Sequence, residues 1–409
     1  MTGAGTVTPD RQRVEHARVA IGVAFAMNGF AYAGWLSRTP AVRADLDLST
    51  AGFGLLLLCL SAAAVTALPM SGPLVHRVGP ARAVLLGSMS VTAGLLALAG
   101  GTMSGVVPLA GLGLVLSGLG SSTWDVAMNV EGADVERRLG RTLMPRFHAG
   151  FSLGTVSGAG VGALAASLDV PVHVQLVGTA VLVGVVMLVA VRRFLPLGVG
   201  SESQRKASGA LAAWREPRTL LIGLIVLGFA FTEGTANEWL AITLVDGYGS
   251  SEVAGALGFG TFVTAMTVAR MLGGSALERW GRVAVLRGTA ALALAGLLLV
   301  VSAVSVPVAL VGAVLWGAGA SLGFPVGMSA AADDPVHAAV RVSVVSSIGY
   351  AAFLAGPPLI GFLAERSGVL RALLVVLGAL VLALACSAAA RPLPAVEPAV
   401  TPRERPGSR

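Results

Sequence analysis

The chain has 409 residues and a formal net charge of +7, but only 12% of its residues are charged, 55% are apolar, and its mean hydropathy is +0.82. A soluble domain has about 25% charged residues, so this composition excludes a water-soluble enzyme. The basic residues lie between hydrophobic runs and form no continuous patch, so no nucleic-acid partner is expected. The two cysteines, Cys59 and Cys386, lie inside apolar runs, which argues against a disulfide framework or a metal site. We therefore expect a polytopic protein embedded in the lipid bilayer.

Hydrophobic runs of about 20 residues, the length of a membrane-spanning helix, recur along the chain. They predict an all-α membrane protein with twelve transmembrane helices in two six-helix bundles. The first six spans are expected at residues 18–37, 48–72, 82–102, 105–130, 147–168 and 172–195. The last six are expected at residues 218–243, 253–277, 282–304, 306–331, 342–364 and 368–390.

The predicted spans divide the chain into five segments. These are a cytoplasmic N-terminal tail (1–15), an N-terminal six-helix bundle (16–195), a cytoplasmic central loop (196–217), a C-terminal six-helix bundle (218–390) and a cytoplasmic C-terminal tail (391–409). Lys and Arg favour the cytoplasmic side of a membrane. With both termini inside, 24 of the 28 basic residues (28 − 4) lie inside or near inner helix ends, and those outside are Arg38, Arg43, Arg366 and Arg371. We expect a monomeric, multi-pass protein of the plasma membrane with both termini cytoplasmic.

The two halves of the chain repeat one another. Trp35 begins the run W-L-S-R, and the helix that follows ends in G-P-L-V-H-R-V-G at Gly79. Trp239 begins W-L-A-I, and the next helix ends in G-S-A-L-E-R-W-G at Gly281. A six-plus-six parallel repeat predicts two bundles that rock about a binding site near the middle of the membrane.

The two loops that end these repeats, 72–82 and 274–282, resemble the signature loop G-x-L-x-D-R-x-G-R of the major facilitator superfamily. In that family, the acidic residue of the loop helps to hold the outward-facing state closed at the cytoplasmic side. Here His76 stands in the acidic position of the first loop, and Glu278 stands in that of the second. The resemblance implies a gating role for Gly72, His76, Arg77, Gly79, Glu278, Arg279, Gly281 and Arg282.

Longer segments, among them WDVAMNVEGADVER, HAGFSLGTVSGAGVG and FTEGTANEWL, resemble the YbjJ-like bacterial inner-membrane branch of that superfamily, near the fucose permease group. The resemblance implies proton-coupled transport of a sugar-like or cyclitol-like solute. Asp125 and Asn129 stand where fucose permease has an acid and an asparagine in helix 4, while Val130 replaces its proline. The acid that this group carries in helix 1 has no counterpart between Asn28 and Leu36.

Three titratable residues are candidates for proton coupling: Asp125, Glu233 and His148. An acid in a membrane-spanning helix costs about 2.5–3.5 kcal/mol by insertion scales, so such groups usually face the bundle interior or a water path. The helix around Asp125 is apolar, so the charged form of this residue is expected to be poorly solvated. Each candidate also has a structural alternative. Asp125 can pair with Arg146 or His148, Glu233 can belong to a packing network, and His148 can cap a helix at the interface.

Polar and aromatic residues at helical spacing are candidates for the lining of a substrate cavity. This set comprises Asn28, Tyr32, Trp124, Asn129, Asn237, Trp316 and Tyr350. Trp35 and Trp239, near the outer ends of their helices, are expected in an aromatic belt, and Glu238 is expected to be solvated there. A four-residue glycine stripe is expected to form a smooth seam for helix movement, at Gly150, Gly154, Gly158 and Gly162.

These patterns favour a secondary active transporter that moves a small organic solute by alternating access, coupled to protons. The sequence has no Walker loop G-x-x-x-x-G-K, so ATP is not the expected energy source, and no cofactor is expected. Two alternatives are a proton-driven efflux pump for drugs or metabolites, and a membrane sensor or assembly factor that does not transport. The acids Asp125 and Glu233 argue against the last alternative.

Overall fold

The computed structural model describes residues 11–140, 143–195, 213–334 and 337–392, and these residues form helices and no β-strand. The N-terminal half contains α1 (Arg11–Leu36), α2 (Thr39–Asp45), α3 (Thr50–Val78), α4 (Pro80–Ser104), α5 (Val107–Leu139), α6 (Met144–Ser167) and α7 (Val172–Ala190). The C-terminal half contains α9 (Pro217–Ile242), the π-helical segment η2 (Thr243–Gly247), α10 (Glu252–Val301), α11 (Val306–Ala320), α12 (Gly323–Ala331), α13 (Ala338–Ser367), α14 (Val369–Ala372) and α15 (Leu374–Cys386).

The expected tails and central loop fall mainly outside the described residues. The residues outside the description are 1–10 of the N-terminal tail, 196–212 of the central loop and 393–409 of the C-terminal tail. Residues 11–15, which we expected in the N-terminal tail, are already part of α1. The first helix therefore begins earlier than its apolar run, because polar residues extend it beyond the hydrophobic stretch.

Eleven helices in the described part of the chain are long and apolar enough to cross a membrane. One of them, α10, has 50 residues. At 1.5 Å per residue this is about 75 Å, whereas the hydrocarbon core of a bilayer is about 30 Å thick. Gly281, with φ 74°, interrupts α10 and divides it into two spans. Eleven helices with this one division give twelve spans, which confirms the predicted all-α membrane fold.

Gly281 has an equivalent in the first half. Gly79, between α3 and α4, has φ 88° and ψ 155°, and Gly281 has φ 74° and ψ 166°. Essentially only glycine adopts this backbone conformation. The two signature loops therefore turn the chain in the same way at corresponding points, in agreement with the sequence repeat.

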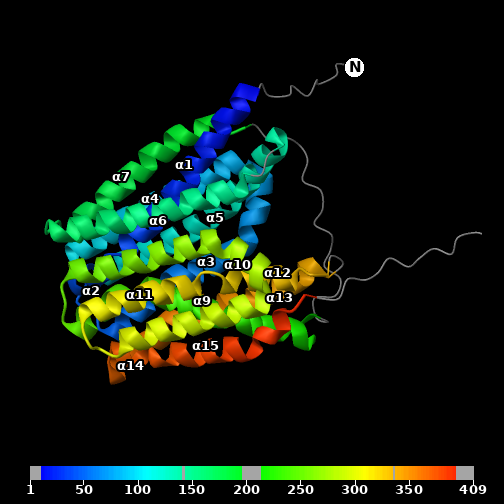
Figure 1. The fold of residues 1–409 in the computed structure, drawn as a ribbon. Coiled ribbons are helices and arrows are strands. Elements are labelled where there is room, and N and C mark those ends of the chain that lie inside the picture. Colours follow the sequence, from blue (N-terminus) through cyan, green and yellow to red (C-terminus); the bar gives the residue numbers. More distant parts are fainter. Residues whose placement is uncertain (1–10, 141–142, 196–212, 335–336, 393–409) are drawn as a thin grey trace, which may run out of the picture.

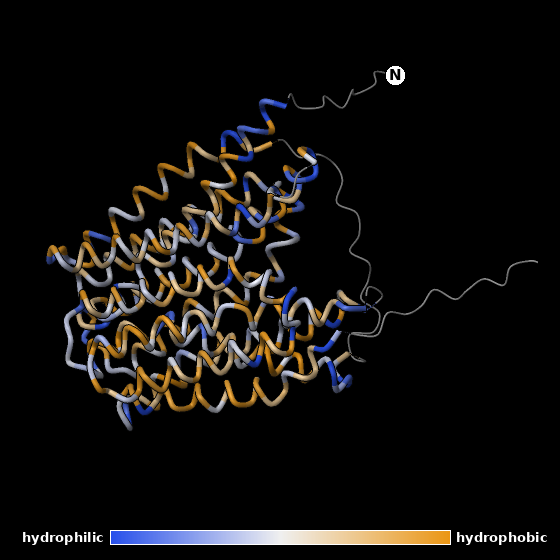
Figure 2. Tube along the Cα trace, viewed as in Figure 1, coloured by the Kyte–Doolittle hydropathy of each residue, from blue (hydrophilic) through white to orange (hydrophobic). Residues whose placement is uncertain are grey.

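The helices form two groups, with α1 and α3 to α7 on one side and α9 to α15 on the other (Figure 1). The groups meet at the end where α2 and α14 lie, called here the closed end, and they diverge toward the end at which α1 begins, the diverging end. Figure 2 shows hydrophobic residues along the length of the helices and hydrophilic residues gathered toward the two ends. A bilayer around the middle of the molecule requires this distribution.

The glycine stripe of α6 packs against α1 within the N-terminal half, and the two helix backbones approach closely there. A side chain at Gly154 would collide with the backbone of Ala26, and one at Gly158 would lie 2.5 Å from the carbonyl oxygen of Phe30. Both partners belong to α1, so the stripe lets α6 approach α1 closely. The halves approach closely at another glycine: a Cβ at Gly54 of α3 would lie 2.6 Å from the carbonyl oxygen of Pro357 in α13.

Candidate functional site

A cavity of about 300 Å³ lies between the two halves of the molecule. It is lined by α1, α3, α4, α5 and α6 of the N-terminal half and by α9 and α13 of the C-terminal half. Its polar and aromatic lining consists of Asn28, Tyr32, Trp35, Ser61, Ser117, Ser121, Ser122, Asp125, Phe151, Glu238, Tyr350 and Phe353. At about 30 Å³ per water molecule, the cavity has room for about ten waters or for one small organic solute.

Asp125 reaches this cavity from α5. The side-chain amide of Asn129, one turn further on, donates to the Asp125 backbone oxygen at 2.8 Å and to Oδ1 at 3.3 Å. The Asp125 side chain is exposed along the cavity. The carboxylate therefore faces the cavity, in keeping with the expectation that an acid in a membrane-spanning helix faces the bundle interior or a water path.

Glu238 of α9 is the second acid of the cavity. We expected it in solvent at the outer end of its helix, but the residue is only 7% exposed. The helical segment continues through η2 to Gly247, so Glu238 lies about two turns before its end. Within the described residues, no group pairs with its carboxylate. The apolar run that follows Glu238, from Leu240 to Leu244, is the sequence signal that indicates its inner position.

Glu233, one turn and a half earlier on α9, does not line the cavity. Its Oε1 lies 3.5 Å from Nη2 of Arg270 in α10. Arg270 also donates from Nε to the backbone oxygen of Ser321 at 3.1 Å. Glu233 is therefore held in an ion pair within the C-terminal half, and its partner lies on α10 rather than on the first helix, where the packing alternative placed it.

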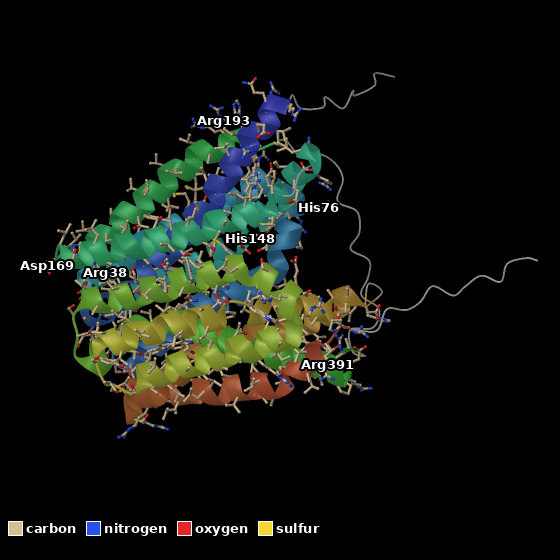
Figure 3. The ribbon with its side chains drawn as sticks, viewed as in Figure 1. Arg38, His76, His148, Asp169, Arg193 and Arg391 are labelled. Atoms are coloured by element: carbon tan, nitrogen blue, oxygen red, sulfur yellow. The ribbon has the colours of Figure 1, made fainter. Side chains whose placement is uncertain are left out.

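His148 lies in the first part of α6, and its ring packs edge-on against Phe25, with 5.1 Å between the ring centroids. Figure 3 shows His148 between the two halves and away from both ends of the molecule. It is not among the residues that line the cavity.

The structure brings three of the predicted cavity residues into the lining: Asn28, Tyr32 and Tyr350. Two other residues of the predicted set are not in the lining but contact lining residues. Asn129 bonds Asp125 as described, and Asn237, which is buried, lies beside the Tyr32 hydroxyl.

Trp124 and Trp316 are buried between helices and lie outside the cavity lining. Trp124 packs against α4 where Gly87 leaves space for it. Trp316 packs edge-on against Phe262, with 5.8 Å between the ring centroids. In both cases a helix contact encloses the indole, so neither ring reaches the solute space.

Trp35 and Trp239 do not form the expected aromatic belt. Trp35 is 2% exposed and lines the cavity. Trp239 is fully buried and packs edge-on against Phe53 of α3, with 6.0 Å between the ring centroids. Phe53 belongs to the other half of the molecule, so the contact between halves covers a residue that the sequence places near a helix end.

Polar contacts join the two halves at the closed end. Arg38 donates to Glu252 Oε2 at 3.2 Å and to Gln175 Oε1 at 3.1 Å, and Arg43 pairs with Asp246. A further acid of the C-terminal half, Glu365, accepts bonds at the start of α3 from the Thr50 hydroxyl at 2.8 Å and the Ala51 backbone at 3.2 Å. Each of these contacts between halves has its donor in the N-terminal half and its carboxylate in the C-terminal half.

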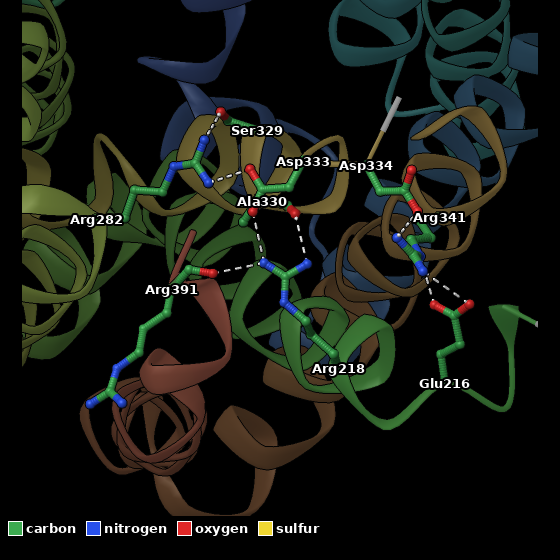
Figure 4. A network of polar contacts seen from close by, with 9 residues as sticks. All are labelled: Glu216, Arg218, Arg282, Ser329, Ala330, Asp333, Asp334, Arg341 and Arg391. Carbon is green, nitrogen blue, oxygen red and sulfur yellow. Dashed lines mark hydrogen bonds and ion pairs between the residues drawn. The ribbon is translucent and has the colours of Figure 1, made fainter. Parts of the chain in front are cut away.

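The second signature loop belongs to a polar network at the diverging end (Figure 4). Arg282 donates to Asp333 Oδ1 at 2.5 Å and to the Ser329 hydroxyl at 3.0 Å. Arg218 donates to the other oxygen of Asp333 at 2.7 Å. Glu278 is exposed, and Arg279 lies over the ring of Trp280, 5.4 Å from its centroid.

The first signature loop has a different environment. Gly72, His76 and Arg77 are all exposed, and Figure 3 shows His76 at the diverging end. Within the described residues, the side chains of His76 and Arg77 form no hydrogen bond or ion pair with the C-terminal half. The loop that lacks the acidic residue is thus not attached to the opposite half in this conformation.

A two-half, twelve-span architecture, with a cavity between the halves that holds two carboxylates, defines the class of polytopic membrane transporters. The model of the Major Facilitator Superfamily matches residues 17–339 and 222–408 of this chain. The chain therefore belongs to the Major Facilitator Superfamily, whose members are membrane transporters rather than enzymes.

Two relatives in bacteria support the same family. The uncharacterized transporter y4wD of Sinorhizobium fredii is 35% identical over 349 residues, which cover 85% of this chain and 91% of that protein. The membrane protein MosC of Rhizobium meliloti is 27% identical over 364 residues, which cover 88% of this chain and 86% of that protein.

Solved structures show the same fold at low sequence identity. A structure of the nucleoside transporter NupG has a TM-score of 0.78 and 15% identity, and the match covers 91% of this chain and 99% of that one. The E. coli fucose:proton symporter FucP has a TM-score of 0.60 and 14% identity, with 92% and 99% covered.

Proposed function

We propose that this chain is a secondary active transporter that carries a small polar organic solute across the plasma membrane by alternating access, driven by protons. The observation that carries the proposal is the cavity between the halves, because it holds two carboxylates, Asp125 and Glu238, one from each half. A site that both halves share changes its surroundings when the halves rock against each other.

The polar contacts of the closed end support an inward-facing state. The ion pairs between the halves, Arg38 with Glu252 and Arg43 with Asp246, lie there. Arg193 and Arg391 lie at the diverging end, together with His76 (Figure 3). Because basic residues favour the cytoplasmic side, the diverging end is proposed to face the cytoplasm, with both termini on that side.

Proton coupling is assigned to Asp125, with Glu238 as its partner across the cavity. Enclosure by protein disfavours the charged form of a carboxyl group, whereas water favours it. A carboxyl group that alternates between the two environments binds a proton in one state and releases it in the other. Differential affinity of this kind couples an ion to a conformation. Glu233 ranks behind both acids because Arg270 already pairs with it.

The lining supports a small polyol-like solute, in agreement with the resemblance to the fucose permease group. Hydroxyls and an amide offer hydrogen bonds, and the rings of Tyr32 and Tyr350 offer flat apolar faces. The FucP match adds a neighbour whose own description is a fucose:proton symporter. The cavity lies within one chain, so the proposed transport unit is a monomer.

Proteoliposomes with an imposed pH gradient test this function. They are screened with sugars, cyclitols, amines and dyes for proton flux that depends on both the solute and the protein. The proposal predicts such flux for a small polar solute. Flux with dyes alone would favour the efflux alternative, and no flux in any class would contradict proton-coupled transport.

A further inference from the structure

The charge of the cavity bears on the kind of solute it accepts. Asp125 and Glu238 are the charged residues of its lining, which includes no Lys, Arg or His. Two arginines near the interface between the halves are engaged in other contacts: Arg38 binds Gln175 and Glu252, and Arg270 binds Glu233. The electrostatic field inside the cavity is therefore set by two carboxylates without a fixed counter-charge in the lining.

Of the two cavity acids, Glu238 is the one whose carboxylate is buried without a partner among the described residues. Its side chain is buried, and within the described residues its carboxylate forms no hydrogen bond or ion pair. Burial of a carboxylate without a partner is unfavourable, so the group requires either a proton or a cation. A cation that enters the cavity meets this requirement directly, and an anion increases the cost.

Aromatic residues line the same space. Tyr32, Trp35 and Phe151 line it from the N-terminal half, and Tyr350 and Phe353 line it from the C-terminal half. The face of an aromatic ring attracts a cation such as an ammonium group, and the attraction is stronger when the site is desolvated. Two carboxylates and five aromatic residues in one lining suit a positively charged organic group.

Building on the transport function proposed above, we propose that the transported solute is a small organic cation, with a primary amine or ammonium group bound between Glu238 and Asp125. The uncharged remainder of the solute is bound by hydroxyls of the lining. Among these, the Ser117 hydroxyl is buried and forms no hydrogen bond within the described residues. The cavity volume of about 300 Å³ accommodates a solute with one ring or a short branched chain.

Matched pairs of probes separate charge from shape. The pairs are glucosamine with glucose, choline with its neutral carbon isostere, and cyclohexylamine with cyclohexanol, near neutral pH and at constant ionic strength. The full-length protein in lipid nanodiscs is heated with each probe, because a ligand that binds the folded state raises the Tm. We expect a cation to raise the Tm more than its neutral partner in at least one pair.

Variants connect the effect to the cavity. We expect Glu238→Gln to lower the apparent affinity for that cation about tenfold or more, because a charge-assisted bond is lost. Asp47→Asn is the matched control. It also converts a carboxylate to an amide, but it lies on an exposed loop at φ 48°, a conformation that asparagine accepts. The control should bind the cation as the wild type does.

Two results would overturn the proposal: neutral partners that match or exceed the cations in every pair, or a cation effect that Glu238→Gln and Asp125→Asn both leave intact. Exchange of labelled probes by proteoliposomes separates this failure from failure of the transport function. If only neutral probes are exchanged, the chain transports and the charge inference is wrong. If no probe is exchanged and the pH-gradient screen finds no solute, the transport function itself is contradicted.

Discussion

Arg38 of the N-terminal half and Glu252 of the C-terminal half form an ion pair across the interface between the bundles, with 3.2 Å between Nη2 and Oε2. Arg38 is buried at 4% exposure and is also held by the side chain of Gln175. Arg38 is thus bonded to its own half through Gln175, and its ion pair with Glu252 is the contact that breaks when the halves separate. The pair stabilises the closed end only in this conformation.

Glu252→Gln should therefore shift the population toward the state in which the closed end opens. The pair is partly exposed, so its loss should cost at most about 1 kcal/mol, which changes the ratio of the two states by about fivefold. The measurement is labelling of a cysteine introduced at Ala31, a cavity residue, by an impermeant reagent applied at the closed end. Arg137→Gln breaks a pair within α5 and serves as the control, with no change in labelling expected.

His76→Asp should shift the population in the same direction by a different route. A carboxylate at the diverging end can accept bonds from a facing helix N-terminus and from arginines, whereas a neutral imidazole is a weaker partner. The substitution restores the acidic position of the signature loop and should favour closure of the diverging end. The same cysteine at Ala31 should then be labelled faster from the closed end. Unchanged labelling would show that His76 does not control this equilibrium.

Local signals made most of the fold predictable. A membrane span needs about 20 apolar residues, and such a run is visible without any knowledge of tertiary contacts. Gly79 and Gly281 were equally visible, because each ends a repeated motif. The structure explains the glycine at these points, since essentially only glycine accepts the backbone conformation found there. These features depend on neighbours in the chain.

The cavity depended on contacts that the sequence does not display. Trp239 is covered by Phe53, which lies on the opposite half, and Glu238 beside it is buried with it. Hydropathy places both near a helix end, where lipid or water was expected. Trp124 was expected in the cavity lining, but α5 and α4 approach closely at Gly87 and the ring is fully buried between helices.

Asp333→Asn should lower the Tm of the protein. Asp333 lies between Arg218 and Arg282, at 2.7 Å and 2.5 Å, and its side chain is only 10% exposed. The amide leaves two arginines without a counter-charge, and we expect a loss of about 1–3 kcal/mol in unfolding free energy. Thermal unfolding in detergent checks this, with Asp134→Asn as the milder comparison, because Asp134 also pairs with two arginines but its side chain is 25% exposed. An equal Tm for the two variants would contradict the role assigned to the network.

Stability at acid pH should depend on Glu216, which lies just before α9. Arg341 donates to its two oxygens at 2.7 Å and 3.3 Å, and this guanidinium holds the pKa of Glu216 below its usual value of 4.5. A carboxyl group with a depressed pKa in the folded state contributes stability above its unfolded pKa, and the contribution is lost as the pH falls through the folded value.

The Tm of the wild type should therefore exceed that of Glu216→Gln at neutral pH, and the difference should shrink as the pH falls below 4.5. Thermal scans of both proteins across this range provide the measurement. A difference that stays constant into strong acid would mean that the contact acts through packing rather than charge.

Proton coupling through Asp125 is the central claim, and Asp125→Asn tests it most directly because the amide keeps the shape and imitates the protonated carboxyl group. The measurement compares two assays of one preparation of proteoliposomes: uptake of a transported solute driven by a pH gradient, and exchange of that solute without a gradient. The account predicts that Asp125→Asn abolishes gradient-driven transport and preserves exchange. Gradient-driven transport at the wild-type rate in this variant would contradict the account and move the coupling role to Glu238.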